Sequence, residues 1–145
     1  MLGGTRMLFT RQKLECRNDV LEVTPNGAIL EIAFSGVHGS GVGEEVGDYV
    51  IKTVEDLRPE AVVLNFLSFK YVGWNDIGGI IRAFFRKGEP PKVRPCCIVA
   101  EGKTARSLRS LLEMAQLTRA FDITFFEEVP EAVDHLRSRL EGQTA

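Results

Sequence analysis

The sequence has too few of the residues that would mark several common classes of protein. It contains three cysteines, and this odd number argues against a framework of disulfide bonds. No apolar run approaches the ~18 residues that cross a bilayer, and the amino-terminus has no apolar signal core. The net charge of −2 arises from well-mixed signs, so the chain lacks a basic footprint for nucleic acid. We therefore expect a cytoplasmic protein that neither inserts into a membrane nor binds nucleic acid.

Residue types that catalyse reactions or bind metals are also scarce. His135 lies beside the apolar stripe of a predicted helix and is interpreted as a surface or boundary residue. His38 and Ser40 could form a base and a nucleophile, but no acid is evident to orient the histidine. Cys96 and Cys97 are adjacent in an apparent strand, and no other Cys or His lies at ligand spacing from them. We interpret both as reduced core thiols and expect no enzymatic activity, no metal and no cofactor.

The rest of the composition is typical of a globular domain. Hydrophobic residues make up 44% of the 145 residues and charged residues 26%. A chain of this length is expected to form a single domain that buries roughly two-thirds of its unfolded surface. The weak pattern of residues 1–18 predicts an extension of uncertain structure, in which 7–9 and Leu14 could form a strand or a short helix. The domain itself is assigned to residues 19–142, and residues 143–145 form a tail.

Hydrophobic periodicity predicts an alternation of strands and helices. Strands are predicted at 20–24, 28–34, 61–66, 93–100 and 121–126, and helices at 44–58, from 77 to Gly88, from a Thr104 cap to 115, and from Pro130 to 142. Pro25-Asn26-Gly27 between the first two strands is typical of a hairpin turn. Pro95 indicates either an edge strand or the first residue of its strand. The fold class is therefore α/β, with a mixed, mostly parallel sheet of about five strands, an amino-terminal hairpin and four helices packed on it.

A glycine-rich loop from Gly36 to Gly43 precedes the first predicted helix. Glycine-rich turns in this position can expose backbone amides to anions. The loop lacks the Gly-Lys-Ser/Thr pattern of a P-loop, and Glu44 and Glu45 would compete with a phosphate for the helix terminus. A flexible connection is the main interpretation, and binding of a nucleotide or an anion is the alternative.

The loop after the strand at 61–66 carries the single tryptophan of the chain, Trp74. Asn75 or Asp76 can cap the helix that follows. In open α/β sheets, ligands and partners usually dock at the carboxyl ends of strands, where this loop lies. Trp74 is interpreted either as an anchor for a partner or as a lid folded over Phe69 or Tyr71.

The order of elements and two segments resemble the STAS domain, the fold of bacterial anti-sigma factor antagonists and of the cytoplasmic tails of sulfate transporters. These segments are AVVLNFLSFKYV, at 61–72, and ARSLRSLLEMAQLTRAFDITFFEEVPEAV, at 105–133. The resemblance implies a signal-transducing module for protein–protein interaction rather than an enzyme. In this family a kinase, often the anti-sigma factor, typically phosphorylates a Ser or Thr in an Asp-Ser-Ser-Gly turn before the second helix.

This chain departs from the family pattern at that turn. Gly73-Trp74-Asn75-Asp76, or Asn75-Asp76-Ile77-Gly78 in a second alignment, stands where Asp-Ser-Ser-Gly would be. Neither alignment contains a hydroxyl group, and the nearest is on Ser68. We therefore expect no phosphorylation at the turn. Asp76 is interpreted as a helix cap, or as a permanent negative charge weaker than that of a phosphoserine.

The sequence thus predicts a partner-binding surface formed by two loops at one end of the sheet. The residues assigned to this surface are Tyr71, Trp74, Asn75, Asp76, His38 and Ser40. The resemblance implies a partner of the anti-sigma factor or kinase type, or another STAS protein, and a homodimer stays open. The alternative is a sensor domain that encloses a small molecule, a nucleotide or an anion between Gly36–Gly43 and the Trp74 turn.

Overall fold

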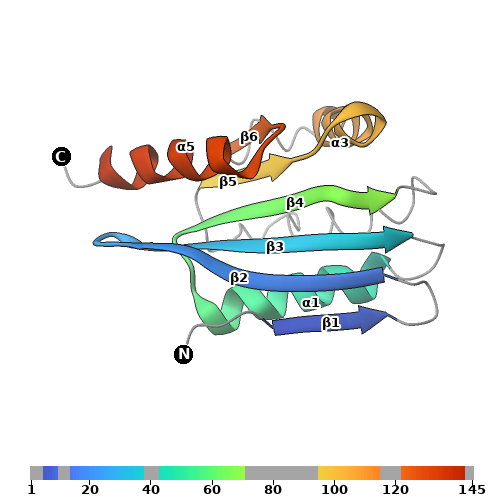
Figure 1. Ribbon diagram of the computed structural model, residues 1–145, viewed down its shortest axis with the longest axis horizontal. Coiled ribbons are helices and arrows are strands. Elements are labelled where there is room, and N and C mark those ends of the chain that lie inside the picture. Colours follow the sequence, from blue (N-terminus) through green and yellow to red (C-terminus); the bar gives the residue numbers. More distant parts are fainter. Residues whose placement is uncertain (1–4, 10–13, 38–42, 71–94, 115–121, 143–145) are drawn as a thin grey trace.

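The computed structural model describes residues 5–9, 14–37, 43–70, 95–114 and 122–142. They form a mixed sheet of six strands, which lie side by side in the order of the sequence (Figure 1). The strands are β1 (Thr5–Phe9), β2 (Leu14–Thr24), β3 (Gly27–Val37), β4 (Ala61–Lys70), β5 (Pro95–Val99) and β6 (Asp122–Phe126). The helices of the described ranges are α1 (Gly43–Leu57), α3 (Gly102–Met114) and α5 (Val129–Gly142). The α/β class and the mixed sheet that the sequence predicts are confirmed.

The amino-terminal hairpin pairs β2 with β3 in antiparallel register around the predicted turn. Gly27 has a φ of 130°, a conformation that glycine adopts without strain. The Thr24 hydroxyl donates to the Gly27 carbonyl at 2.9 Å and accepts from the Asn26 amide at 3.1 Å. These bonds close the turn, and the Asn26 side chain extends the contact by donating to the Leu140 carbonyl at the end of α5.

The hairpin begins earlier than the sequence predicts. The start assigned at Val20 is wrong because β2 already begins at Leu14. β1 then pairs antiparallel with β2, from Thr5 opposite Asn18 to Phe9 opposite Leu14. All of the residues of the 1–18 extension that the structure describes, 5–9 and 14–18, are therefore part of the sheet, which has one strand more than the five predicted ones.

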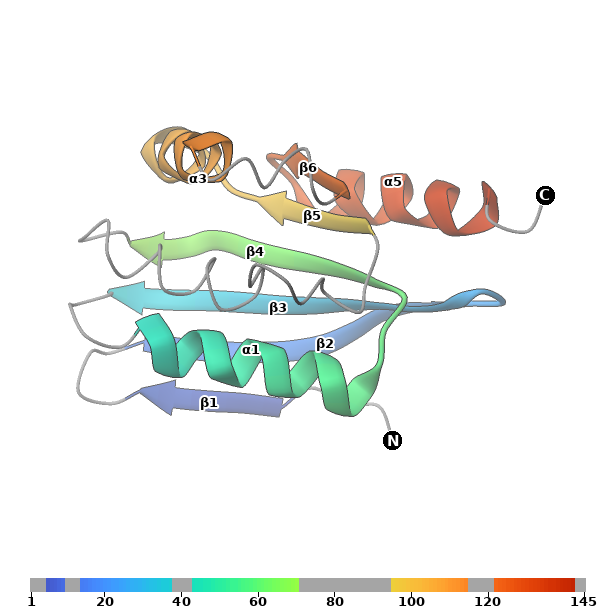
Figure 2. The same ribbon diagram turned by 180° about the vertical axis from the view of Figure 1, so that it is seen from behind.

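Beyond the hairpin, the strands β3, β4, β5 and β6 are parallel. α1 covers one face of the sheet and α5 the other, as the two opposite views show (Figures 1 and 2). α3 lies on the α1 face, because its Leu108 and Leu112 belong to the core cluster that contains Val50 of α1. The remaining predicted helix, from 77 to Gly88, falls within 71–94 and lies outside the described residues.

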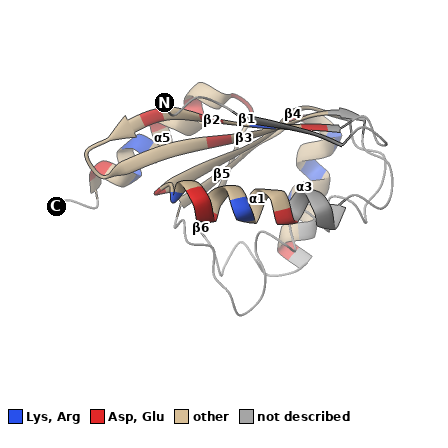
Figure 3. Cartoon of the chain, turned by 90° about the horizontal axis from the view of Figure 1, so that it is seen from below, with Lys and Arg blue, Asp and Glu red and all other residues tan. Residues whose placement is uncertain are grey.

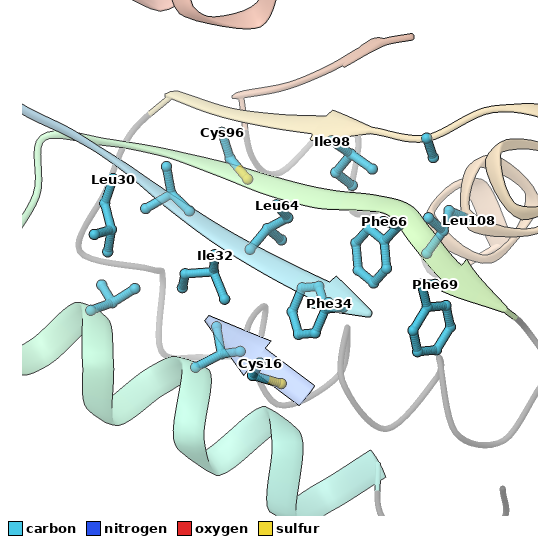
Figure 4. Close-up of a cluster of buried hydrophobic side chains, with 14 of the residues drawn as sticks. Cys16, Leu30, Ile32, Phe34, Leu64, Phe66, Phe69, Cys96, Ile98 and Leu108 are labelled. Carbon is cyan, nitrogen blue, oxygen red and sulfur yellow. The ribbon is translucent and has the colours of Figure 1, made fainter. Parts of the chain in front are cut away.

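Each face of the sheet has its own hydrophobic core. The larger core joins α1 and α3 to the sheet through Leu30, Ile32, Phe34, Leu64 and Ile98 (Figure 4). The smaller core joins α5 to the opposite face, through Ala132, Leu136 and Leu140 against residues such as Ile29, Val63 and Val99. Cys96 lies in the first core and Cys97 in the second, so these adjacent, buried cysteines of one strand face opposite sides of the sheet, and their interpretation as core residues is confirmed.

Several predicted boundaries and orientations need correction. The spacing of apolar residues in α1 puts Leu57 on its buried stripe, but Leu57 is 43% exposed because the helix ends there and Arg58 turns to a φ of 47°. α3 begins at Gly102, so Thr104 lies inside the helix and does not cap it. Of the two alternatives for Pro95, the second is confirmed: it is the first residue of β5, which lies between β4 and β6 and is not an edge strand. The placement of Pro130 in the first turn of the last helix is confirmed.

Candidate functional site at the carboxyl end of the sheet

β3 and β4 end side by side at the carboxyl end of the parallel strands. Their register continues to the last pair, Val37 beside Lys70. Residues 38–42 and the chain from 71 onward therefore leave the sheet from adjacent positions and at the same end. This arrangement brings together the starts of the two segments that the sequence assigns to one surface.

The assigned side chains themselves are not described. His38 and Ser40 fall within 38–42, and Tyr71, Trp74, Asn75 and Asp76 fall within 71–94, so all of them lie outside the described residues. Their roles in partner binding stay predictions. Ser68, the nearest hydroxyl to the expected turn, is an exposed residue of β4 that pairs with Ser35 of β3.

An aromatic cluster supports the ends of these two strands (Figure 4). The rings of Phe34 and Phe66 stack with their centroids 4.6 Å apart. Phe69 meets both rings edge-on, at 5.7 Å from Phe66 and 6.4 Å from Phe34. All three side chains are at most 4% exposed. Because aromatic pairs in these geometries add attraction beyond simple burial, the cluster holds the ends of β3 and β4 together.

Phe69 was assigned to the loop, whereas it is a buried residue of the strand. The reason is a β-bulge: Ala33 and Ser35 of β3 stand opposite Asn65 and Ser68 of β4, so β4 carries one extra residue there. The extra residue shifts the alternation, so that Phe66 and Phe69 face the same core. Strict alternation of buried and exposed residues stops at the bulge, and a prediction that relies on it ends the strand too early.

Asn65 holds the bulge in place on the α5 face. Its Oδ1 accepts a hydrogen bond from the Leu67 amide at 2.9 Å, and its Nδ2 donates to Glu31 Oε2 at 3.1 Å. Glu31 is only 6% exposed, and its other carboxylate oxygen lies 3.8 Å from the Arg17 guanidinium. The buried carboxylate thus has both an amide and a cation as partners, as a buried charge requires. We interpret this cluster as structural.

A second feature of the same end lies where β5 and β6 finish. α3 follows β5 on one face of the sheet, and α5 follows β6 on the opposite face. Two adjacent parallel strands whose connections turn to opposite faces leave a crevice between them, the usual location of ligand sites in open α/β sheets. The structure has a cleft of about 480 Å³ at this position.

The residues that line the cleft are partly apolar and partly charged. The apolar ones are Ala100, Ala105, Phe125 and Phe126; Phe125 packs against the core on the α3 face, and Phe126 against the core on the α5 face. Arg106 and Arg109 come from the α3 side, and the carboxylates of Glu127 and Glu131 from the α5 side. The Arg109 guanidinium lies over the Phe125 ring, 4.6 Å from its centroid, which orients one cation. Sequence reasoning missed this cleft because the opposite placement of α3 and α5 cannot be read from periodicity.

The electrostatics elsewhere favour stability rather than chemistry. Acidic and basic residues are spread over the described elements and are not gathered on one of them (Figure 3). Arg137 of α5 donates two hydrogen bonds to Glu22 of β2, at 2.6 and 2.7 Å, and these bonds lower the pKa of that carboxyl. Burial raises the pKa of the Cys16 thiol to about 12, so that it stays protonated. Within the described ranges, no group of three or more His, Cys, Asp and Glu residues could hold a metal ion.

Comparison with known proteins identifies the fold. No family model matches the sequence, and no curated protein matches it. Among solved structures, an anti-sigma factor antagonist from Mycobacterium paratuberculosis superposes with a TM-score of 0.53 at 16% identity, over 83% of this chain and 94% of that one. The chain has the fold of that anti-sigma factor antagonist. The similarity in sequence is too low to extend beyond the fold.

In the part of the chain that the structure describes, no helix is both long enough and apolar enough to cross a bilayer.

Proposed function

We propose that this domain is a non-catalytic regulatory module of the STAS type, which binds a protein partner in the cytoplasm through the carboxyl end of its sheet. The observation that carries the proposal is the pairing of Val37 with Lys70, which places the starts of 38–42 and of the chain from 71 onward beside each other. A surface made of two adjacent loops on a rigid sheet suits recognition, because the scaffold pays little entropy on binding. The likeness of the fold to an anti-sigma factor antagonist supports the same role.

The partner expected from this fold is a protein of the anti-sigma factor or kinase type, or a second STAS protein. Phosphorylation at the turn would not control the interaction, because residues 73–78 contain no Ser, Thr or Tyr. Control would instead come from the amount of partner, or from changes elsewhere in either protein. Trp74 is the residue that we propose as the anchor, since tryptophan is over-represented among the residues that dominate interface energies.

The experiment compares two variants at opposite ends of the sheet. The tagged domain captures its partner from a lysate of the native host, and the affinity of the purified partner is then measured by calorimetry. Trp74→Ala should weaken binding by about 2 kcal/mol or more while the melting temperature hardly changes. Val23→Thr is the matched control, because Val23 is 66% exposed near the hairpin turn, at the other end of the sheet. Binding that survives Trp74→Ala and is lost in Val23→Thr would place the interface at the hairpin end of the sheet and contradict the proposal.

The free protein allows a simpler test of Trp74, since it is the single tryptophan of the chain. An anchor exposed to solvent should emit like indole in water and be quenched readily by iodide. A blue-shifted emission that iodide does not quench would show that the ring is a lid over neighbouring side chains, and would remove it from the proposed surface.

A further inference from the structure

The cleft between α3 and α5 holds charges of both signs that do not neutralise one another. Within the described residues, Arg106 and Arg109 form no ion pair with Glu127 or Glu131, although all four line the same cleft. The arginines belong to α3, and the glutamates to the first turn of α5 and the residues before it. The two pairs of opposite charge are therefore separated by more than the reach of a direct ion pair.

This distribution of charge discriminates among classes of ligand. A simple anion such as phosphate would be attracted by the two arginines but repelled by the two carboxylates. A simple cation would be attracted by the carboxylates but repelled by the arginines. All four charged residues are exposed to water, and an uncharged apolar molecule would gain no electrostatic interaction with any of them. A molecule with a negative group at one end, a positive group at the other and an apolar body between them would complement the whole lining.

We propose that this cleft binds a small zwitterion with separated charges, of the class of a short apolar peptide with free termini. Its carboxylate would bind Arg106 and Arg109, and its ammonium group would bind Glu127 and Glu131. Its side chains would pack on apolar residues of the lining such as Ala105 and Phe125. Arg109 is already oriented by its contact with Phe125, which reduces the ordering that binding requires. The location, where adjacent parallel strands send their helices to opposite faces, is the usual one for ligands in this class of sheet. None of the described residues that line the cleft is assigned to the protein partner, and the proposal does not depend on that assignment.

The test uses leucyl-leucine as the probe and the full chain as the protein. Heteronuclear NMR spectra are recorded during titration to millimolar concentrations, with N-acetyl-leucyl-leucine and leucyl-leucine amide as matched probes that each lack one charge. We expect saturable shifts in the backbone amides of Ala105, Phe126 and Glu127 with leucyl-leucine. Each blocked probe should bind roughly tenfold more weakly, the change that follows from losing one hydrogen bond to a charged group.

Variants test whether the arginines bind the carboxylate of the probe and the glutamates its ammonium group. Arg106→Gln should weaken leucyl-leucine but leave the affinity for the amide, which lacks the carboxylate, unchanged. Glu131→Gln should weaken leucyl-leucine but leave the affinity for the acetylated probe unchanged. Lys103→Gln is the control on α3, because Lys103 is exposed and does not line the cleft. The absence of saturable shifts at millimolar probe, equal binding of the blocked probes, or an equal effect of Lys103→Gln would each overturn the proposal.

Discussion

Phe66 offers the sharpest test of how the carboxyl end of the sheet is held together. Its side chain is 1% exposed, stacks on Phe34 at 4.6 Å and meets Phe69 edge-on at 5.7 Å. Truncation of a buried phenylalanine to alanine costs about 3–5 kcal/mol, and each aromatic pair contributes about 0.5–1.5 kcal/mol beyond burial. Because Phe66→Ala removes two such pairs, we expect a loss of about 4 kcal/mol, a large part of the ~5–15 kcal/mol that stabilises a typical domain.

The assay is urea unfolding followed by circular dichroism. With a typical m-value of ~2 kcal/mol per M, a loss of ~4 kcal/mol lowers the midpoint by about 2 M. Leu67→Ala is the matched control, because Leu67 is the next residue of β4 and is 36% exposed. The control should cost less than ~1 kcal/mol. If both variants unfolded at the same urea concentration, the aromatic cluster would not support the ends of these strands as described.

Three further predictions concern charge, thiol reactivity and modification. Because Arg137 lowers the pKa of Glu22 below its usual 4.5, the stability that this pair adds should be present above pH 4.5 and lost as the pH falls below it. In urea titrations, Glu22→Gln should therefore unfold at a lower urea concentration than the wild type at pH 7, and this difference should shrink toward pH 3. Cys16, with its pKa raised to about 12, should resist iodoacetamide at pH 8 until urea unfolds the chain, and rapid labelling of the native protein would contradict its burial. Incubation with an anti-sigma kinase and ATP should leave the peptide that spans 73–78 unmodified, whereas phosphate on Ser68 in mass maps would revive a phosphorylation switch.

The parts of the fold that the sequence predicts well are those with strong local signals. A run of apolar, β-branched residues predicts β4 as a strand that is covered on both faces, and Asn26-Gly27 predicts the turn of the hairpin. The buried side of α5 follows from the spacing of Ala132, Leu136 and Leu140. In each case a few neighbouring residues decide the structure, so that distant contacts are not needed to predict it.

The parts that it misses depend on contacts between distant residues. Asn18 is polar and breaks the apolar pattern of β2, yet it is 4% exposed because its amide donates to the Tyr49 hydroxyl of α1 at 3.0 Å. The bulge that places Phe69 in the core depends on the register with β3. The cleft at the end of β5 and β6 depends on which face each helix covers. A window of neighbouring residues carries no signal for any of these features.

The site assigned from the sequence has a mixed outcome. The structure brings the ends of β3 and β4 together, which is the backbone arrangement that the two-loop surface requires. The side chains assigned to that surface lie outside the described residues, and their roles stay predictions.

Hydrogen–deuterium exchange of the domain with and without its purified partner is the most direct test of the partner-binding surface. Protection of peptides that cover 38–42 and 71–78 is the predicted result, with little change in the hairpin turn around Gly27 or in the last turns of α5. Protection confined to the hairpin turn and α5, with the two loops exchanging as in the free protein, would contradict the proposal that the domain binds its partner through the carboxyl end of the sheet.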